Sequence, residues 1–162
     1  MIRRAREEEL PAVGRLTFEA YRADGHLAGR EDGYYAGQLA NARPRYEEAE
    51  LLVAVDDAGT LLGTVTIARS GSSWREIGRP DELEFRMLAV SPTARGRGVG
   101  EAMTRRVLDR ATELGLAAVV LSSSADMRAA HRLYERLGFR RTPDLDWSPE
   151  PTISLITYRL DL

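Results

Sequence analysis

Short apolar runs alternate along the chain with segments in which apolar residues recur at helical spacing. The short runs predict strands of a largely buried sheet, at residues 2–5, 51–55, 61–68, 83–90, 117–121, 139–142 and 153–160. The helically spaced segments predict helices, at about residues 8–21, 34–41, 99–114 and 127–137. Gly115 and Gly138 stand where the last two of these helices should end. The order of elements predicts one α/β domain over residues 1–162.

Composition narrows the function. The 162 residues suit about one domain, and a net charge of -2 gives no overall field that would attract nucleic acid or a membrane surface. The absence of Cys excludes a disulfide framework and a cysteine nucleophile, and two histidines are too few for a histidine-based metal centre. No run is long enough to span a membrane, and the N-terminus lacks a signal-peptide core. We therefore expect a cytoplasmic protein without a metal. The sequence is also compatible with a homodimer.

The segment from Phe85 to Gly100 is the most informative part of the chain. An apolar strand ends in a Ser-Pro turn, and glycines then alternate with other residues before an amphipathic helix begins. Glycine lets an oxyanion approach the backbone closely, and the first turn of a helix has unpaired N–H groups at its positive end. Arg95 and Arg97 add positive charge there. These features predict a phosphate-binding turn.

Three kinds of phosphate-binding turn compete for this segment. A P-loop requires Lys and Ser or Thr after its last glycine, where this chain continues differently, and a dinucleotide fingerprint requires glycine where Glu101 stands. The remaining pattern is Arg95-x-x-Gly98-x-Gly100. It resembles the acyl-CoA-binding signature, R/Q-x-x-G-x-G/A, of the GCN5-related N-acetyltransferase (GNAT) superfamily.

A second segment strengthens the resemblance. Residues 130–139 read Ala-His-Arg-Leu-Tyr-Glu-Arg-Leu-Gly-Phe, which is similar to the second signature of the superfamily, A-x-x-L-Y-x-x-x-G-F. Ala130, Leu133 and Leu137 share one helical face, and Tyr134 lies beside that face. The two signatures follow in the same order and separation as in the family. The resemblance is strong over residues 83–140 and elsewhere rests on element order.

The resemblance implies an acyl-CoA N-acyltransferase fold, with a mixed sheet of about seven strands and about four helices. It implies that acetyl-CoA lies between the central strand and the next one, where its pantetheine bonds to the backbone of Leu88, Ala89 and Val90. The pyrophosphate would bind the segment Arg95, Gly96, Arg97, Gly98, Val99, Gly100 and Glu101. Tyr134 would lie near the sulfur as general acid. Direct attack by an amine needs a base, oxyanion donors and an acid, but no covalent enzyme intermediate.

Two positions depart from the family pattern. Many members have Asn where Met127 stands, and its amide contacts the cofactor, so that contact must be replaced or absent here. Some members place a Glu base where this chain has Ser122. The better candidate for the base is Glu84 on the central strand, with Glu82 as its neighbour on the same face. The alternative is that both carboxylates belong to a solvated strand end.

The acceptor is not defined by the sequence. His26, Tyr34 and Tyr35 lie where acceptor-binding residues often occur in the family, and a loop with Asp144, Asp146 and Trp147 would suit a cationic amine, unless it is only a solvated loop with one packing Trp. The leading interpretation is an N-acetyltransferase that acetylates a primary amine of a small molecule, peptide or protein through a ternary complex. The alternatives are a catalytically inactive acyl-CoA-binding regulatory module and, less consistent with the charge, a nucleic-acid module.

Overall fold

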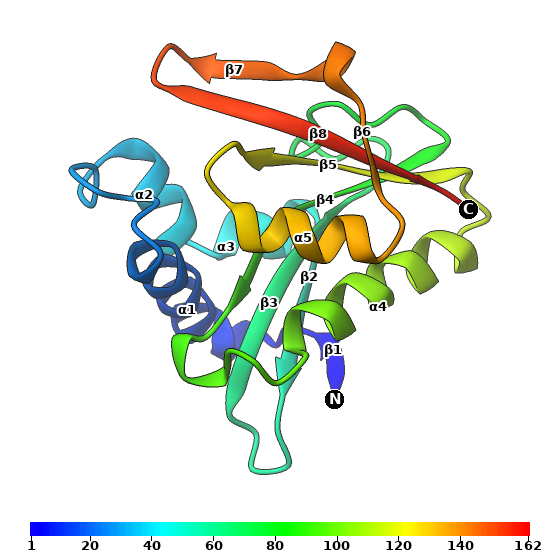
Figure 1. The fold of residues 1–162 in the computed structure, drawn as a ribbon. Helices are drawn as coiled ribbons and strands as arrows, with labels where there is room; N and C mark the ends of the chain where they lie inside the picture. The colour runs from blue at the N-terminus through cyan, green and yellow to red at the C-terminus, as the bar shows by residue number, and fades with distance from the viewer.

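The computed structural model describes residues 1–162 and consists of a mixed sheet with helices on both faces (Figure 1). The eight strands are β1 (Ile2–Arg4), β2 (Glu50–Val55), β3 (Leu61–Ala68), β4 (Glu82–Val90), β5 (Ala118–Ser124), β6 (Arg140–Arg141), β7 (Trp147–Glu150) and β8 (Ile153–Asp161). The helices are α1 (Leu10–Ala23), α2 (Tyr34–Ala40), α3 (Arg43–Glu48), α4 (Val99–Glu113) and α5 (Arg128–Arg136). None of these helices has the length and apolar character that a membrane crossing requires.

The strands are ordered β1-β2-β3-β4-β5-β8-β6, and β7 pairs with β8. All neighbours are antiparallel except β4 and β5, which run parallel and are connected through α4. A parallel pair needs such a crossover, because a tight turn cannot bring the chain back to the same end of the sheet. At the parallel pair, the chain therefore leaves the end of β4 and enters α4 at the N-terminal end of this helix.

Strand alternation distributes apolar side chains to both faces of the sheet. On β2, Leu51, Val53 and Val55 pack in the cluster that contains residues of α1, whereas Leu52 and Ala54 pack in the main core with residues of α4. Successive side chains of a strand point to opposite faces, so a strand covered on both sides has apolar residues throughout. This explains why the sequence of β2 is a continuous apolar run.

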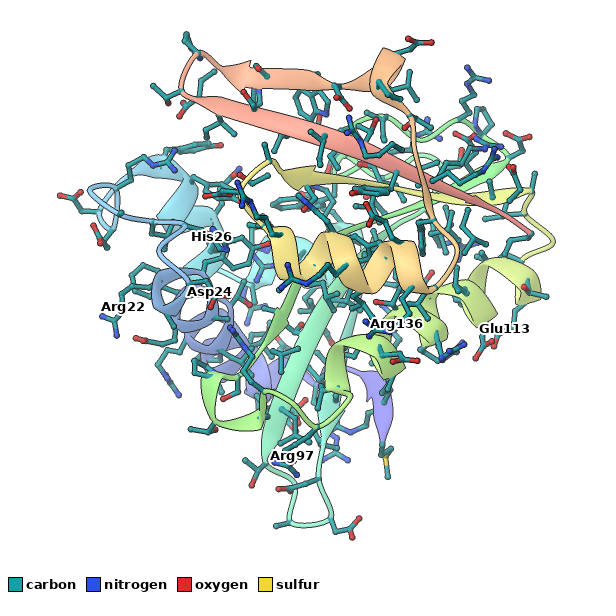
Figure 2. The ribbon with its side chains drawn as sticks, viewed as in Figure 1. Arg22, Asp24, His26, Arg97, Glu113 and Arg136 are labelled. Carbon is teal, nitrogen blue, oxygen red and sulfur yellow. The ribbon has the colours of Figure 1, made fainter.

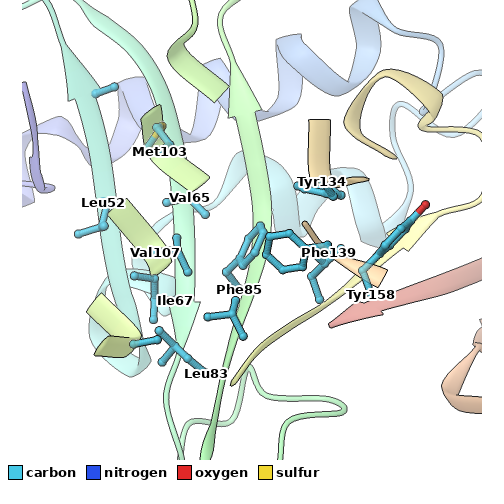
Figure 3. Close-up of a cluster of buried hydrophobic side chains, with 14 of the residues drawn as sticks. Leu52, Val65, Ile67, Leu83, Phe85, Met103, Val107, Tyr134, Phe139 and Tyr158 are labelled. Carbon is cyan, nitrogen blue, oxygen red and sulfur yellow. The ribbon is translucent and has the colours of Figure 1, made fainter. Parts of the chain in front are cut away.

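The main core contains an aromatic cluster at its α5 end (Figure 3). The ring of Tyr134 lies with its centroid 5.8 Å from Phe85, 5.7 Å from Phe139 and 5.9 Å from Tyr158. Aromatic pairs at these separations favour edge-to-face or tilted geometry, which is the geometry found here. The cluster connects α5 to β4 and β8, and it sets the position of Tyr134.

Strand β4 contains a bulge that reverses its alternation. Met87 has a φ of 52°, and the register with β3 shifts between Thr64 and Thr66. Phe85 packs in the core beside α4, but Met87 and Ala89 pack in the cluster beside α1 and α2. A bulge inserts one extra residue into a ladder and re-aims the side chains that follow. The odd-numbered residues of β4 therefore point toward α4 before the bulge, and toward α1 and α2 from Met87 onward.

The pairing of β4 with β5 ends before either strand does. Their ladder runs from the Glu82–Ala118 pair to the Phe85–Leu121 pair, although β4 continues to Val90 and β5 to Ser124. Beyond Phe85 the two strands separate. The backbone of β4 along this stretch pairs with β3 on one side only, so its other edge is open to a ligand.

The predicted fold class is confirmed, with one further strand and one further helix. The segment of β7 was expected as loop; its Pro149 is tolerated because β7 is an edge strand that pairs irregularly with β8. Helix α3 was not expected either. Its buried Arg45 donates to the carbonyl oxygens of Gln38, at 2.5 Å, and Leu39, at 3.2 Å, and so satisfies the C-terminal end of α2.

Helix α1 packs against α2 through a glycine, and this contact can be tested. A Cβ added at Gly14 would lie 1.9 Å from the carbonyl oxygen of Ala40, which is backbone and cannot rotate away. We predict that Gly14→Ala lowers the free energy of unfolding by about 3 kcal/mol, as overpacking does in other cores. The matched control is Gly37→Ala on α2, where a Cβ meets nothing within 4 Å. Urea denaturation should show no loss in the control, and equal losses would contradict the contact.

Candidate active site

The glycine turn before α4 adopts the conformation that a phosphate-binding turn needs. Gly96 has a φ of 73° and Gly98 a φ of 76°, which side chains with a Cβ rarely adopt. The first helical hydrogen bond runs from Ala102 N–H to the Gly98 carbonyl at 3.0 Å. The N–H groups before Ala102, including that of Gly100, therefore have no partner within the helix. They lie at the positive end of the α4 dipole.

A groove of about 540 Å³ is lined by this turn, the end of β4, α1 and α5. It is lined by all but one of the predicted cofactor-binding residues: Leu88, Ala89, Val90, Arg95, Gly96, Gly98, Val99, Gly100 and Glu101. Arg97 is the exception. It is exposed between the two glycines and does not line the groove, and Figure 2 shows it well apart from His26.

Helix α5 forms the opposite wall of the groove and contributes arginines that sequence reasoning missed. Arg128, Arg132 and Arg136 line the groove and lie at i, i+4 and i+8, which is one helical face. That spacing was the signal that could have found them. Arg95, in contrast, is held in place by α1: its guanidinium donates to Asp24 at 2.8 Å and to the carbonyl oxygen of Ala20 at 3.4 Å.

A second cavity, of about 560 Å³, lies on the other side of the separated strands. Its wall includes Tyr34, Tyr35 and Trp147, together with the carboxylates Asp32, Glu76 and Glu150 and the cations Arg30 and Arg86. The two cavities share five lining residues: Tyr21, His26, Leu88, Met127 and Ala130. The groove and the second cavity therefore adjoin beside the end of β4 and the start of α5.

Tyr134 lines the second cavity from the aromatic cluster described above. Its ring is buried, and its hydroxyl makes no hydrogen bond to another protein group. Burial, together with the neighbouring Tyr158, raises the pKa of Tyr134 well above its ordinary value. The phenol therefore keeps its proton at neutral pH, and the cavity is where that proton can be donated.

The structure does not bring Glu84 to either cavity. Its side chain is fully buried, and Oε1 accepts backbone N–H bonds of 2.9 Å from each of Glu76, Ile77 and Gly78. Burial raises the pKa of Glu84, although these three bonds oppose the shift. Its neighbour Glu82 is also buried and pairs with Arg159. The position of Glu84 thus gives no support to its predicted role as base and shows instead that it anchors residues 76–78.

The two residues that depart from the family pattern, Met127 and Ser122, both contact neighbouring side chains. Met127 lines both cavities, and its sulfur lies 3.8 Å from the Ser123 hydroxyl, which in turn is 3.1 Å from His131 Nε2. The Ser122 hydroxyl accepts a bond of 3.0 Å from Trp147 Nε1. Ser122 is therefore a structural partner of a tryptophan that lines the second cavity.

Of the acidic loop residues, neither Asp144 nor Asp146 lines the second cavity. Asp144 is exposed. Asp146 accepts the backbone N–H of Thr157 at 2.9 Å and pairs with Arg141 at 2.5 Å, which orients it toward β8. Only Trp147 of that loop reaches the cavity, so a cationic amine would meet Asp32, Glu76 or Glu150 there and not these two aspartates.

Comparison with known proteins identifies the family. The Acetyltransferase (GNAT) family matches residues 15–139, which include both signatures and the groove described above. The chain belongs to the GNAT family of acetyltransferases.

Two curated relatives have different names. A mycothiol acetyltransferase from Arthrobacter sp. is 32% identical over 140 residues, which are 83% of this chain and 39% of that protein. An N-acetylaspartate synthetase from Danio rerio is 42% identical over 64 residues, 40% of this chain and 23% of that protein. The chain thus spans about two fifths, or less, of the length of these relatives.

Solved structures share the fold. An acetyltransferase of the GNAT family from Staphylococcus aureus superposes with a TM-score of 0.77 at 14% identity and covers 100% of this chain and 98% of that chain. A Salmonella typhimurium structure with its cofactor acetyl-CoA gives a TM-score of 0.69 at 23% identity and covers 100% of this chain and 93% of that chain.

The glycine turn gives the first prediction for the site. Gly98→Val places a β-branched residue at a positive φ, which costs about 1–3 kcal/mol and disturbs the N–H groups that face the groove. CoA affinity measured by calorimetry should therefore fall more than about tenfold. Gly59→Val is the matched control, because Gly59 has a φ of 82° in the β2–β3 hairpin, outside the groove. Equal affinity in the two variants would contradict the assignment.

The anchoring role of Glu84 gives the second prediction for the site. Glu84→Leu removes the acceptor of three N–H bonds and should lower the free energy of unfolding by about 3 kcal/mol. Glu84→Gln keeps an oxygen acceptor of nearly the same shape, so its loss should be much smaller. Urea denaturation of both variants measures the difference. Similar losses in the two variants would show that the three bonds do not hold residues 76–78.

Proposed function

We propose that this chain catalyses transfer of the acetyl group of acetyl-CoA to the nitrogen of a primary amine. The observation that carries the proposal is that two cavities adjoin at the end of β4 that has parted from β5, one beside a phosphate-binding turn and the other beside the phenol of Tyr134. Such an arrangement lets two substrates approach each other without a covalent enzyme intermediate.

The residues of the groove fit acetyl-CoA. The left-handed glycines and the free N–H groups of the first turn of α4 suit a pyrophosphate, and the arginines of α5 add positive charge. The open backbone edge of β4 from Leu88 to Val90 suits the amide groups of pantetheine, which need donors and acceptors in an extended array. When bound, acetyl-CoA supplies an acetyl thioester, whose carbonyl is open to attack by an amine.

Tyr134 acts on the leaving sulfur in this proposal. Its ring is held by the aromatic cluster, and its hydroxyl is free of protein partners and keeps its proton. A phenol so placed donates a hydrogen bond as negative charge develops on sulfur, and then the proton. The likeness of residues 130–139 to the second family signature supports this role.

The acceptor is proposed to bind in the second cavity, where aromatic rings and three carboxylates surround the approach to Tyr134. The related proteins are named for mycothiol and for N-acetylaspartate, so amino acids, amino sugars and peptides all belong in a screen. Tyr34, which is 84% exposed, marks the outer rim, so a larger acceptor such as a peptide would contact it first.

A screen of primary amines tests the proposal directly. Free CoA released from acetyl-CoA is followed with a thiol reagent, and acceptors that contain a thiol are followed by mass detection of the acetylated product. Amine-dependent CoA release is the expected result. Binding of acetyl-CoA by calorimetry, without CoA release for any class of amine, would instead favour the alternative of a catalytically inactive acyl-CoA-binding regulatory module.

The role of Tyr134 gives a further prediction. Tyr134→Phe keeps the ring in its aromatic cluster and removes only the hydroxyl, so folding and CoA affinity should change little. Turnover should fall by about 10²–10⁴-fold, the usual contribution of a general acid. Steady-state kinetics with the best amine and calorimetry with CoA separate the two effects. Full turnover in the variant, with chemistry rate-limiting, would contradict the role.

A further inference from the structure

The five residues that line both cavities are the candidates for the group that accepts the amine proton. An amine that attacks the thioester must lose a proton where the groove and the second cavity meet. Leu88, Met127 and Ala130 cannot accept one, and burial raises the pKa of Tyr21 well above its ordinary value, so its phenol stays protonated. The remaining shared residue is His26, and a neutral imidazole has one nitrogen that can accept a proton.

His26 is oriented by a carboxylate from a distant part of the chain. It lies in the loop after α1, and its Nδ1 is 3.3 Å from Oδ2 of Asp126 in the turn between β5 and α5. Because a carboxylate only accepts, this bond places the imidazole proton on Nδ1 and leaves the lone pair of Nε2 available. Asp126 is itself held by the hydroxyl of Ser124, 2.7 Å from Oδ1.

The ring is also fixed by packing. Its centroid lies 6.1 Å from that of Tyr21 in an edge-to-face arrangement, and only 14% of the His26 side chain is exposed. Figure 2 places His26 between α1 and the N-terminal end of α5, which is where the two cavities join. The Arg30 guanidinium donates to the carbonyl oxygen of His26, so the backbone of the loop is held as well.

Of the carboxylates of the second cavity, Asp32 and Glu150 do not line the groove and so lie away from the junction, and Glu150 pairs with Arg30 at 3.9 Å. Glu84 is buried beneath residues 76–78, and Glu76 pairs with Arg86 at 3.4 Å. His131, the other histidine, lines neither cavity, and its ring packs against Tyr158. His26 is thus the one group at the junction that has both a free basic nitrogen and a partner that orients it.

We propose that His26, oriented by Asp126, is the base that accepts the proton of the attacking amine, a role that rests on the proposed acetyltransferase function. The amine nitrogen forms a bond to the carbonyl carbon, and its proton passes to Nε2 of His26. The carbon–sulfur bond then breaks, and the sulfur takes the proton of Tyr134. The imidazolium that forms is stabilised by the Asp126 carboxylate, and proton exchange with solvent restores both residues.

Three titratable or charged groups lie around His26. Tyr21 faces it from α1 and stays neutral, Arg30 bonds to its backbone within the same loop, and Asp126 faces it from the turn before α5. Although burial raises the pKa of Asp126, bonds from Ser124 and His26 hold it below its ordinary value, so this residue stays ionised near neutrality.

The experiment compares the wild type with His26→Gln, His26→Ala and Asp126→Asn, using the best amine from the screen. At neutral pH, His26→Gln should lower turnover by about 10²–10⁴-fold while the affinity for CoA is kept. The acidic limb of the pH–rate profile that belongs to the imidazole should disappear, and activity should partly return at high pH, where the amine arrives neutral. Added imidazole should restore turnover in His26→Ala but not in Tyr134→Phe, which a merely structural role for His26 would not produce.

The matched controls are His131→Gln, which removes the other histidine, and Asp144→Asn, which neutralises an exposed aspartate outside both cavities. Wild-type turnover and a wild-type pH profile in His26→Gln would overturn the proposal. So would loss of the acidic limb in Glu84→Gln with its retention in His26→Gln, since the base would then be Glu84. Absence of CoA release by the wild type with every amine would instead contradict the proposed function itself.

Discussion

The separation of β4 from β5 after the Phe85–Leu121 pair is the constraint on which the site depends. Had the ladder continued, the backbone edge of β4 would be occupied by β5, and neither cavity could reach the other. The bulge at Met87 accompanies this separation and turns the following residues toward the opposite faces of the sheet. The separation leaves an open backbone edge, and the bulge beside it changes which face of the sheet each residue of β4 lines.

The rest of the structure holds that opening in shape. The aromatic cluster fixes Tyr134 on one side, and Arg95, bonded to Asp24 and Ala20, ties the glycine turn to α1 on the other. These are contacts between elements far apart in sequence. They place rigid groups around a space that the sheet leaves free, which is how a site can be pre-organised without its ligand.

Two buried charged side chains in this molecule have a structural role. Glu84 accepts three backbone N–H bonds, and Arg45 donates to carbonyl oxygens at the end of α2. Both side chains satisfy backbone groups of irregular segments that would otherwise be left without partners. A charged residue within an apolar strand therefore does not by itself identify a catalytic group, whereas its hydrogen-bond partners do.

The sequence by itself determined the fold class, the order of the main elements and the glycine turn, because these depend on local periodicity and on two signatures with fixed spacing. It did not determine β7, α3 or the surroundings of Glu84, which depend on pairing with distant segments. The sequence likewise could not predict that His26 and Asp126, which are 100 residues apart in the chain, lie next to each other. Local patterns specify which elements form, but only tertiary packing decides which side chains meet in the space between them.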